Sequence, residues 1–348
     1  MTVGQMVSLT KSRIAGVVTC CPTRRIDADF FYDRFTEEEV SNTQKISGVA
    51  HRYWVDNKQS SLDLSMAAAV RLIAGLNWQT EEIDAIIYVT QSPENFLPAT
   101  SIRMAHRVGM RAGVLAFDIN LGCSGYPYGL GVLMGMVESG MLKKALLVAS
   151  ETPSRIIDQQ DKSTAMLFGD AGSVTAVEAG VAEPSHFVFG SDGAGADNLV
   201  IPYCRFSGNK LVDDPRLVGR NPDYLYMDGS EVFNFTLKRV PPLVAEAQEQ
   251  ASAHGIDYYL FHQANHFMLE HLRKKMKLDP AKVPFNIADY GNTSVASIPL
   301  LITTRLAQRI ATGPSSHVGM FGFGVGYSWS SCITTLNKNL YLEHCHES

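Results

Sequence analysis

One cysteine, one histidine and one asparagine stand at positions where nucleophilic and hydrogen-bonding chemistry could meet. Cys123 lies in DINLGCSGYPYGL, after the apolar run 114–119 and before the small-residue-rich run 128–140. This pattern predicts a thiol at the turn where a strand leads into a helix. There, unpaired backbone N–H groups and the helix dipole favour the thiolate, which is the nucleophile. The alternative is a small buried cysteine that fills a tight turn.

His262 and Asn292 are the two candidate hydrogen-bond donors. His262 follows the apolar run 258–261, and Asn292 lies in DYGNTSVAS. Alone, His262 fits a core histidine bonded to a backbone carbonyl, and Asn292 fits a helix cap or turn residue. Beside a thiolate that accepts an acyl group, the same two donors would stabilise the oxyanion of a second thioester.

The glycine string at 322–326, GFGVG, suggests a nucleotide-binding loop at first sight. Such a loop needs a helix directly after it, so that the helix N-terminus meets a phosphate. Here the strand-like run YSWSSCITTL follows. We therefore expect a turn that presents backbone N–H groups to the site.

The elements that must position these residues alternate between strand-like and helix-like segments, which predicts an α/β protein with a mixed sheet covered by helices on both faces. The pattern predicts strands over 83–90 and 144–150, two short strands within 165–178 hinged at 169–172, an irregular connection over 190–228, and a helix over 232–254 that Pro241 and Pro242 should kink or restart.

The second half of the chain echoes the first. IDAIIYVT matches IDYYLFHQ, FDINLGCSG matches FNIADYGNTS, and MLFGDAGSVTAVE matches MFGFGVGYSWSSCITT, in the same order. Such matched pairs indicate a duplicated βα unit. The duplication predicts that Cys123, His262 and Asn292 lie at comparable strand ends, where sites form in such architectures.

Composition narrows the class of protein. The chain has 348 residues, 45% of them hydrophobic, and a net charge of −5, which gives no bulk attraction to nucleic acid or to anionic membranes. The six cysteines are scattered without CxxC pairs, so we expect neither a zinc site nor a disulfide framework. Cys20 and Cys21 are expected to be structural, and the cluster 344–346 is expected to be a mobile tail without metal. No signal core or bilayer-spanning run is present, which favours a soluble cytoplasmic protein.

The strings DINLGCSGYPYGL, FHQAN, YGNTSVASIPL and GFGVGYSW resemble the signature blocks of the β-ketoacyl-ACP synthase III (FabH-like) family of the thiolase superfamily, and FGDAGS and FLPAT fit the same family. The resemblance implies a five-layered αβαβα thiolase fold and a homodimer. It implies an N-terminal half over 1–180 that carries the nucleophile and a C-terminal half over 181–348 that carries the histidine and asparagine. The family's catalytic triad falls on Cys123, His262 and Asn292, and its oxyanion hole on the backbone N–H groups of Cys123 and Gly326.

The activity that the resemblance implies is a decarboxylating Claisen condensation without metal or cofactor. An acyl group from acyl-CoA or an acyl-carrier protein is held on Cys123 and condenses with malonyl-ACP to give 3-oxoacyl-ACP, in fatty acid initiation or a related specialised pathway. Two alternatives remain: an acyltransferase that passes the acyl group to an alcohol or amine, and a non-catalytic partner subunit. The intact pair of His262 and Asn292 favours condensation, and the intact triad counts against a non-catalytic subunit.

The sequence departs from the family where the acyl donor should bind. The Trp and Arg that stack the adenine of CoA fall on Asn42 and Lys162, and a basic residue linked to carrier docking falls on Phe267. Arg273 and Lys274, further along the same predicted helix, could replace that basic residue or could form a solvated helix face. The donor therefore need not be acetyl-CoA.

Leu97 stands in the loop before Pro98, which in the family reaches across the dimer into the partner's acyl pocket. A Phe there limits chain length, and a Glu marks the head-to-head Claisen (OleA-like) enzymes. Leu97 argues against that branch and is consistent with a longer acyl chain, although it also fits a plain dimer-interface leucine.

Overall fold

The computed structural model describes residues 3–203, 213–251 and 253–348. Within them, the strands are β1 (Gln5–Leu9), β2 (Ser12–Pro22), β3 (Arg25–Ile26), β4 (Arg52–Tyr53), β5 (Ala85–Val89), β6 (Leu115–Ile119), β7 (Lys144–Glu151), β8 (Ala171–Ala179), β9 (Ser185–Ser191), β10 (Leu199–Val200), β11 (Tyr226–Met227), β12 (Tyr258–Phe261), β13 (Ser316–Gly324), β14 (Ser328–Leu336) and β15 (Tyr341–Glu347). The helices are α1 (Glu37–Ser47), α2 (Ser61–Gly75), α3 (Thr100–Val108), α4 (Gly125–Glu138), α5 (Lys162–Ala165), α6 (Gly229–Gln250), α7 (His266–Lys275), α8 (Ile287–Tyr290), α9 (Ser297–Leu301) and α10 (Ala307–Thr312).

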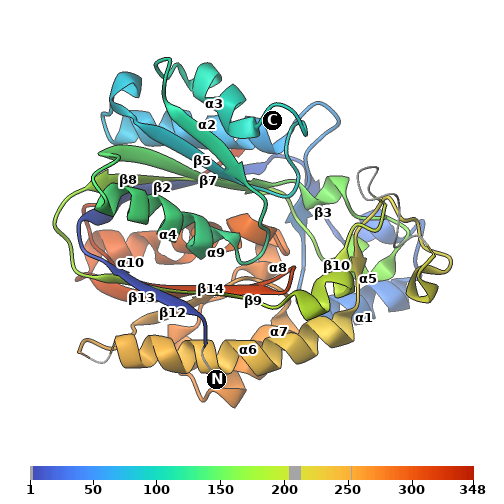
Figure 1. Ribbon diagram of the computed structural model, residues 1–348. Helices are drawn as coiled ribbons and strands as arrows, with labels where there is room; N and C mark the ends of the chain where they lie inside the picture. The colour runs from blue at the N-terminus through green and yellow to red at the C-terminus, as the bar shows by residue number, and fades with distance from the viewer. Residues whose placement is uncertain (1–2, 204–212, 252) are drawn as a thin grey trace.

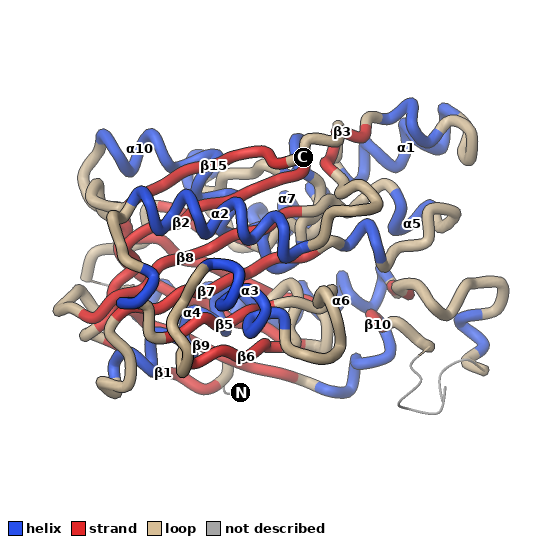
Figure 2. Tube along the Cα trace, turned by 90° about the horizontal axis from the view of Figure 1, so that it is seen from above, coloured by secondary structure: helices blue, strands red, loops and turns tan. Residues whose placement is uncertain are grey.

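Two mixed sheets and three helical layers alternate through the molecule (Figure 1). The six-stranded sheet has the order β15-β2-β8-β7-β5-β6, and the five-stranded sheet has the order β1-β9-β14-β13-β12. Helices α2 and α3 cover the outer face of the six-stranded sheet, as seen from above in Figure 2. Helix α4 contacts both sheets, and α6 covers the outer face of the five-stranded sheet. The expected five-layered αβαβα architecture is confirmed.

The two sheets share one strand order, which confirms the duplicated topology. The run β2-β8-β7-β5 of one sheet corresponds to β9-β14-β13-β12 of the other. Each sheet also takes an edge strand from the far end of the chain, because β1 joins β9 and β15 joins β2. A division of the chain near residue 180 stays a prediction.

Helix α4 fits between the two sheets because its glycines let both approach closely. A Cβ at Gly129 would lie 2.6 Å from Val89 on one side, and a Cβ at Gly131 would lie 2.4 Å from Phe189 on the other. Larger residues at these positions would push the sheets apart, since interiors are close-packed. The small-residue run after Cys123 is therefore a packing requirement that fixes where the helix, and the thiol before it, can lie.

Several predicted elements differ from the structure. The range 165–178 contains a single strand, β8 from residue 171, preceded by the short helix α5, because pairing with β2 on one side and β7 on the other extends the strand through Gly172. Helix α6 runs through Pro241 and Pro242 without a restart. Its buried face packs on β13 and β14, and this packing stabilises the helix by more than the missing backbone hydrogen bonds cost.

The C-terminal segment is also ordered differently from the prediction. Residues 341–347 form β15 in parallel register with β2, so the cluster 344–346 is not a mobile tail. The backbone bonds and the packing of the Tyr341 side chain on the outer core hold this edge strand in place. Cys20 and Cys21 are buried in β2, as expected for structural residues.

The irregular connection predicted over 190–228 is largely confirmed, with only short elements such as β10 and β11 in its described part. The remainder of that connection, including Cys204, lies outside the described residues.

Candidate active site

Cys123 lies in the turn between β6 and α4, two residues before the first residue of the helix. Gly324, at the end of β13, faces it so closely that a Cβ there would lie 2.6 Å from the Cβ of Cys123 and 3.1 Å from its sulfur. The glycine string 322–326 therefore brings the five-stranded sheet against the cysteine turn. The expected position of the thiol at a strand-to-helix turn is confirmed.

The surroundings of Cys123 keep its thiol protonated at rest. Burial and, to a smaller extent, the nearby Glu151 charge raise the pKa of Cys123 to about 12, although the Ser294 hydroxyl and the backbone N–H groups of Cys123 and Val325 act to lower it. The backbone N–H groups favour the thiolate as expected, but burial has the larger effect, because the surrounding protein removes more solvation than these donors restore. A base is needed to ionise this cysteine.

His262 directly follows β12, and its backbone N–H donates to Phe321 O at 2.8 Å, continuing the pairing of the sheet. Its imidazole is 1% exposed, and Nδ1 lies 2.8 Å from Ser297 Oγ. Burial lowers the pKa of His262 to about 3, so the ring is neutral at physiological pH. The Ser297 contact orients the ring, and a hydrogen bond with the Ser294 backbone also acts on it.

Asn292 lies in the loop after α8 rather than at a strand end, which corrects the expectation from the duplication. The five-stranded sheet ends at β12 and has no counterpart of β6, so the segment after Phe285 turns into a short helix instead. The Ser294 N–H donates to Asn292 Oδ1 at 2.9 Å. Because Oδ1 is held in this way, the Nδ2 donor is turned to the other side, where it lies 3.3 Å from Ala264 O.

These three residues line one narrow, mostly apolar cavity of about 70 Å³. Phe323 forms part of its wall, with its ring edge-to-face against His262 at a centroid distance of 5.7 Å. The cavity is lined by Cys123, Leu167, Phe168, Leu199, Met227, Gly229, Val232, Thr236, His262, Ala264, Asn265, Met268, Asn292, Phe323 and Gly324. The arrangement places a nucleophile, two neutral hydrogen-bond donors and an apolar ring around one space.

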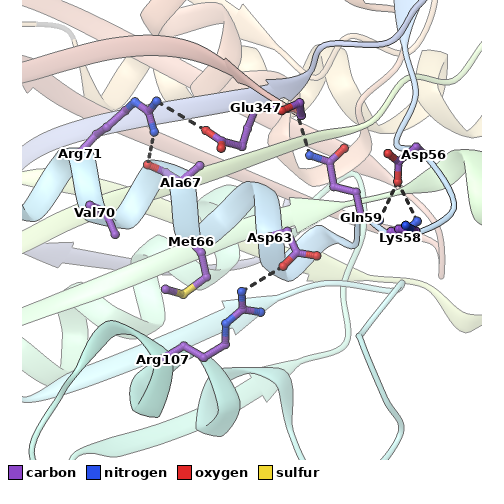
Figure 3. Close-up of a pocket in the computed structure, with 11 residues that line it drawn as sticks. Asp56, Lys58, Gln59, Asp63, Met66, Ala67, Val70, Arg71, Arg107 and Glu347 are labelled. Carbon is purple, nitrogen blue, oxygen red and sulfur yellow. Dashed lines mark hydrogen bonds and ion pairs between the residues drawn. The ribbon is translucent and has the colours of Figure 1, made fainter.

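A larger hollow of about 570 Å³ lies between α2 and the C-terminal residues (Figure 3). Its charged groups neutralise one another, because Arg107 pairs with Asp63 at 3.1 Å and Arg71 pairs with Glu347 at 3.5 Å. It lies apart from Cys123, so size alone does not identify the site.

Comparison with known proteins identifies the family of this chain. Residues 117–196 match the family described as 3-oxoacyl-[acyl-carrier-protein (ACP)] synthase III, and residues 247–336 match its C-terminal family. The β-ketoacyl-[acyl-carrier-protein] synthase III of Streptococcus pneumoniae is 33% identical over 297 residues, covering 83% of this chain and 89% of that protein. This chain belongs to the 3-oxoacyl-ACP synthase III family.

Solved structures agree with this assignment. A 3-oxoacyl-(acyl-carrier protein) synthase from Burkholderia xenovorans LB400 is 45% identical, covers 100% of both chains and superposes with a TM-score of 0.96. The 3-oxoacyl-(acyl carrier protein) synthase III FabH of Pseudomonas aeruginosa PAO1 is 28% identical, covers 94% of this chain and 99% of that chain, and has a TM-score of 0.82. The thiolase-like fold expected from the resemblance is therefore shown.

The residues expected to contact CoA or a carrier lie outside the cavity. Lys162 pairs with Glu39 at 3.1 Å, and Arg273 is held by Glu270 at 2.9 Å. Lys274 is largely exposed, and Phe267 is half exposed and stacks on Phe233. Their roles in this synthase III family member stay predictions.

Leu97 is also outside the cavity, with 87% of its surface exposed. It lies on the loop between β5 and α3. Its role at the acyl pocket of a second subunit stays a prediction.

Sequence reasoning missed four residues around the site. Val325, rather than Gly326, supplies the backbone N–H beside the Cys123 sulfur, because β13 continues only to Gly324 and the chain then turns. Phe323 was not recognised because it lies within the glycine string, and Ser294 was not recognised because its segment is typical of turns. One feature of the sequence could have identified Glu151, because it is a carboxylate directly after the apolar run 144–150.

Among the described residues, no group of three or more histidine, cysteine, aspartate or glutamate side chains could hold a metal ion. None of the helices in the same described part is both long enough and apolar enough to cross a bilayer.

Proposed function

We propose that this chain is a decarboxylating 3-oxoacyl-ACP synthase in which Cys123 carries the acyl group. The observation that carries the proposal is the convergence of Cys123, His262 and Asn292 on one cavity. The acyl donor is an acyl-CoA or an acyl-carrier protein, and the acceptor is malonyl-ACP. Family membership supports this class of reaction.

In the first half-reaction, the Cys123 sulfur attacks the acyl thioester and the carrier thiol leaves. The oxyanion of the tetrahedral intermediate accepts hydrogen bonds from the backbone N–H groups of Cys123 and Val325, which already act on the sulfur. We place the oxyanion hole at this pair and not at Gly326.

In the second half-reaction, His262 and Asn292 donate hydrogen bonds to the thioester carbonyl of malonyl-ACP. Both donors are neutral, and their other polar atoms are held by Ser297 and by the Ser294 N–H. They stabilise the enolate that forms as CO2 departs, and the enolate carbon then attacks the acyl-cysteine. Two preorganised donors favour condensation over simple transfer to an alcohol or amine.

Phe323 supports loss of the carboxylate. Its ring lies beside His262 on the cavity wall, where a malonyl carboxylate would meet an apolar surface. A charged group is destabilised in such surroundings, whereas neutral CO2 is not. We assign to Phe323 the role of the family's phenylalanine near the nucleophile.

The quaternary structure that we propose is a homodimer formed through β6. This strand ends the six-stranded sheet, pairs only with β5 among the described strands, and carries the partly exposed residues Leu115, Phe117 and Ile119. An unpaired edge of this kind favours pairing with a second copy. A cytoplasmic location stays part of the proposal.

The test follows one turnover in two steps. Enzyme acylated on Cys123 is mixed with malonyl-ACP, and CO2 and the product are measured. Stoichiometric CO2 together with a 3-oxoacyl-ACP is expected. Transfer of the acyl group to an alcohol or amine without CO2 release would contradict the proposal.

A further inference from the structure

Glu151 is a buried carboxyl group near Cys123. It is the last residue of β7, is 3% exposed, and accepts the Gln91 N–H at 2.6 Å. Its negative charge acts on the Cys123 sulfur. The two half-reactions described above give this carboxyl group no role.

Ser294 lies between the two groups. Its hydroxyl oxygen is 3.8 Å from the Cys123 sulfur, and hydrogen bonding by the same side chain lowers the pKa of the Glu151 carboxyl group. Ser294 adopts a left-handed backbone conformation with φ of 47°, which is rare for a residue with a side chain and aims the hydroxyl into this gap. Gly122 leaves the room that the hydroxyl needs, since a Cβ there would lie 3.3 Å from Ser294 Oγ.

The charges around Glu151 suit a group that exchanges a proton near neutral pH. Burial raises the pKa of Glu151 to about 7, while the Ser294 hydroxyl and the N–H groups of Gln91 and Val295 lower it. The other charged group that acts on it is Asp170, whose own pKa burial raises to about 6 and Arg155 lowers.

His262 is poorly suited to be the base that deprotonates Cys123. Burial disfavours its protonated form, and its Nδ1 is engaged by Ser297. An imidazole in this state serves as a hydrogen-bond donor in the second half-reaction rather than as an acceptor of the thiol proton.

We infer that Ser294 and Glu151 form a proton relay that deprotonates Cys123 for acylation, a role that rests on the proposed function of Cys123 as acyl carrier. As the sulfur–carbon bond forms, the thiol proton passes to Ser294 Oγ and the Ser294 hydroxyl proton passes to the Glu151 carboxylate. The carbon–sulfur bond of the donor thioester then breaks. The proton returns from Glu151 through Ser294 to the departing carrier thiolate, so the relay ends as it began.

The experiment measures the first half-reaction alone. Single-turnover acylation by an acyl thioester and alkylation by iodoacetamide are followed by intact mass from about pH 5 to about pH 9. In the wild type, both rates should rise with pH and level off near pH 7, where Glu151 loses its proton. Glu151→Gln and Ser294→Ala should remove this inflection and lower the acylation rate near pH 7 by about 100-fold.

A matched control and a second readout separate the relay from a structural effect. Ser150→Ala removes a buried hydroxyl from the neighbouring position of β7 and should keep the inflection. Enzyme that has been acylated in advance should release CO2 from malonyl-ACP at rates within about threefold of wild type in Glu151→Gln, because the relay serves only the first step.

The outcomes are distinguishable from failure of the proposed function. If wild type forms an adduct on Cys123 while Glu151→Gln keeps the inflection, or loses both half-reactions equally, the relay is wrong and the proposed function stands. If the wild type forms no adduct with any thioester, the proposed function itself fails.

Discussion

His262 Nδ1 lies 2.8 Å from Ser297 Oγ, and this contact joins the residue after β12 to the first residue of α9. The contact orients a buried, neutral imidazole on the wall of the cavity that Cys123 also lines. Because Asn292 is held in a similar way by the Ser294 N–H, both donors are oriented before substrate arrives. Preorganisation of this kind is the main source of electrostatic stabilisation in such sites.

The two donors should therefore be needed for decarboxylation and not for acylation. We expect His262→Ala and Asn292→Ala each to lower CO2 release from malonyl-ACP by about 100- to 1000-fold, the effect typical of losing one oxyanion donor. Adduct formation on Cys123 should change far less. Unchanged CO2 release in both variants would exclude the roles assigned to them.

Phe323 should affect the same step through polarity rather than through hydrogen bonding. Phe323→Ala opens the cavity wall beside His262 and lets water reach the malonyl carboxylate, so we expect CO2 release to fall by about tenfold. Phe323→Leu, which keeps the wall apolar, should retain most of the rate. The comparison uses CO2 release from acylated enzyme, and equal losses in the two variants would show that only ring packing matters.

Leu97 should limit acyl chain length in the assembled dimer. Leu97→Phe adds bulk at a residue that is 87% exposed in the single chain, so an effect on substrate choice requires a second subunit. We expect the rate of adduct formation with long acyl thioesters to fall relative to acetyl by about tenfold or more. Val181→Phe, at an exposed position away from this loop, is the control. An unchanged chain-length profile would argue against the loop reaching an acyl pocket.

The buried carboxyl group of Glu151 should make folding stability depend on pH. Its pKa is raised from 4.5 to about 7 in the folded state, so the folded protein holds this proton more tightly than the unfolded chain does. The stabilisation is complete below pH 4.5 and is lost as pH rises through 7, a change of about 3 kcal/mol for this one group.

Glu151→Gln should therefore show a smaller fall in the free energy of unfolding between pH 5 and pH 8 than the wild type. Urea unfolding at the two pH values measures the difference, and the exposed Glu81→Gln provides the control. Identical pH dependence in Glu151→Gln and wild type would mean that Glu151 is not protonated in the folded state at pH 5.

The sequence was most informative where local pattern and tertiary structure agree. The apolar runs around residues 85–89 and 144–151 became central strands, and the small residues after Cys123 became the helix between the sheets. Two of the three matched sequence pairs fall on corresponding strands of the two sheets, β5 with β12 and β8 with β14.

The remaining features depend on contacts between distant segments. Ser294 and Glu151 meet at Cys123 only in the folded chain, and the burial that raises the pKa of Cys123 cannot be read from its neighbours in sequence. Likewise, β15 is a strand because β2 offers it an edge, not because residues 341–347 form a typical strand sequence. Asn292 was placed at a strand end because the duplication is incomplete after β12.

The central claim is that the Cys123 sulfur carries the acyl group, and intact-mass analysis after incubation with acyl-CoAs and acyl-carrier proteins tests it most directly. We expect one acyl adduct per chain in the wild type, localised to Cys123 by peptide mapping, and none in Cys123→Ala. An adduct of the same mass and yield in Cys123→Ala would contradict it.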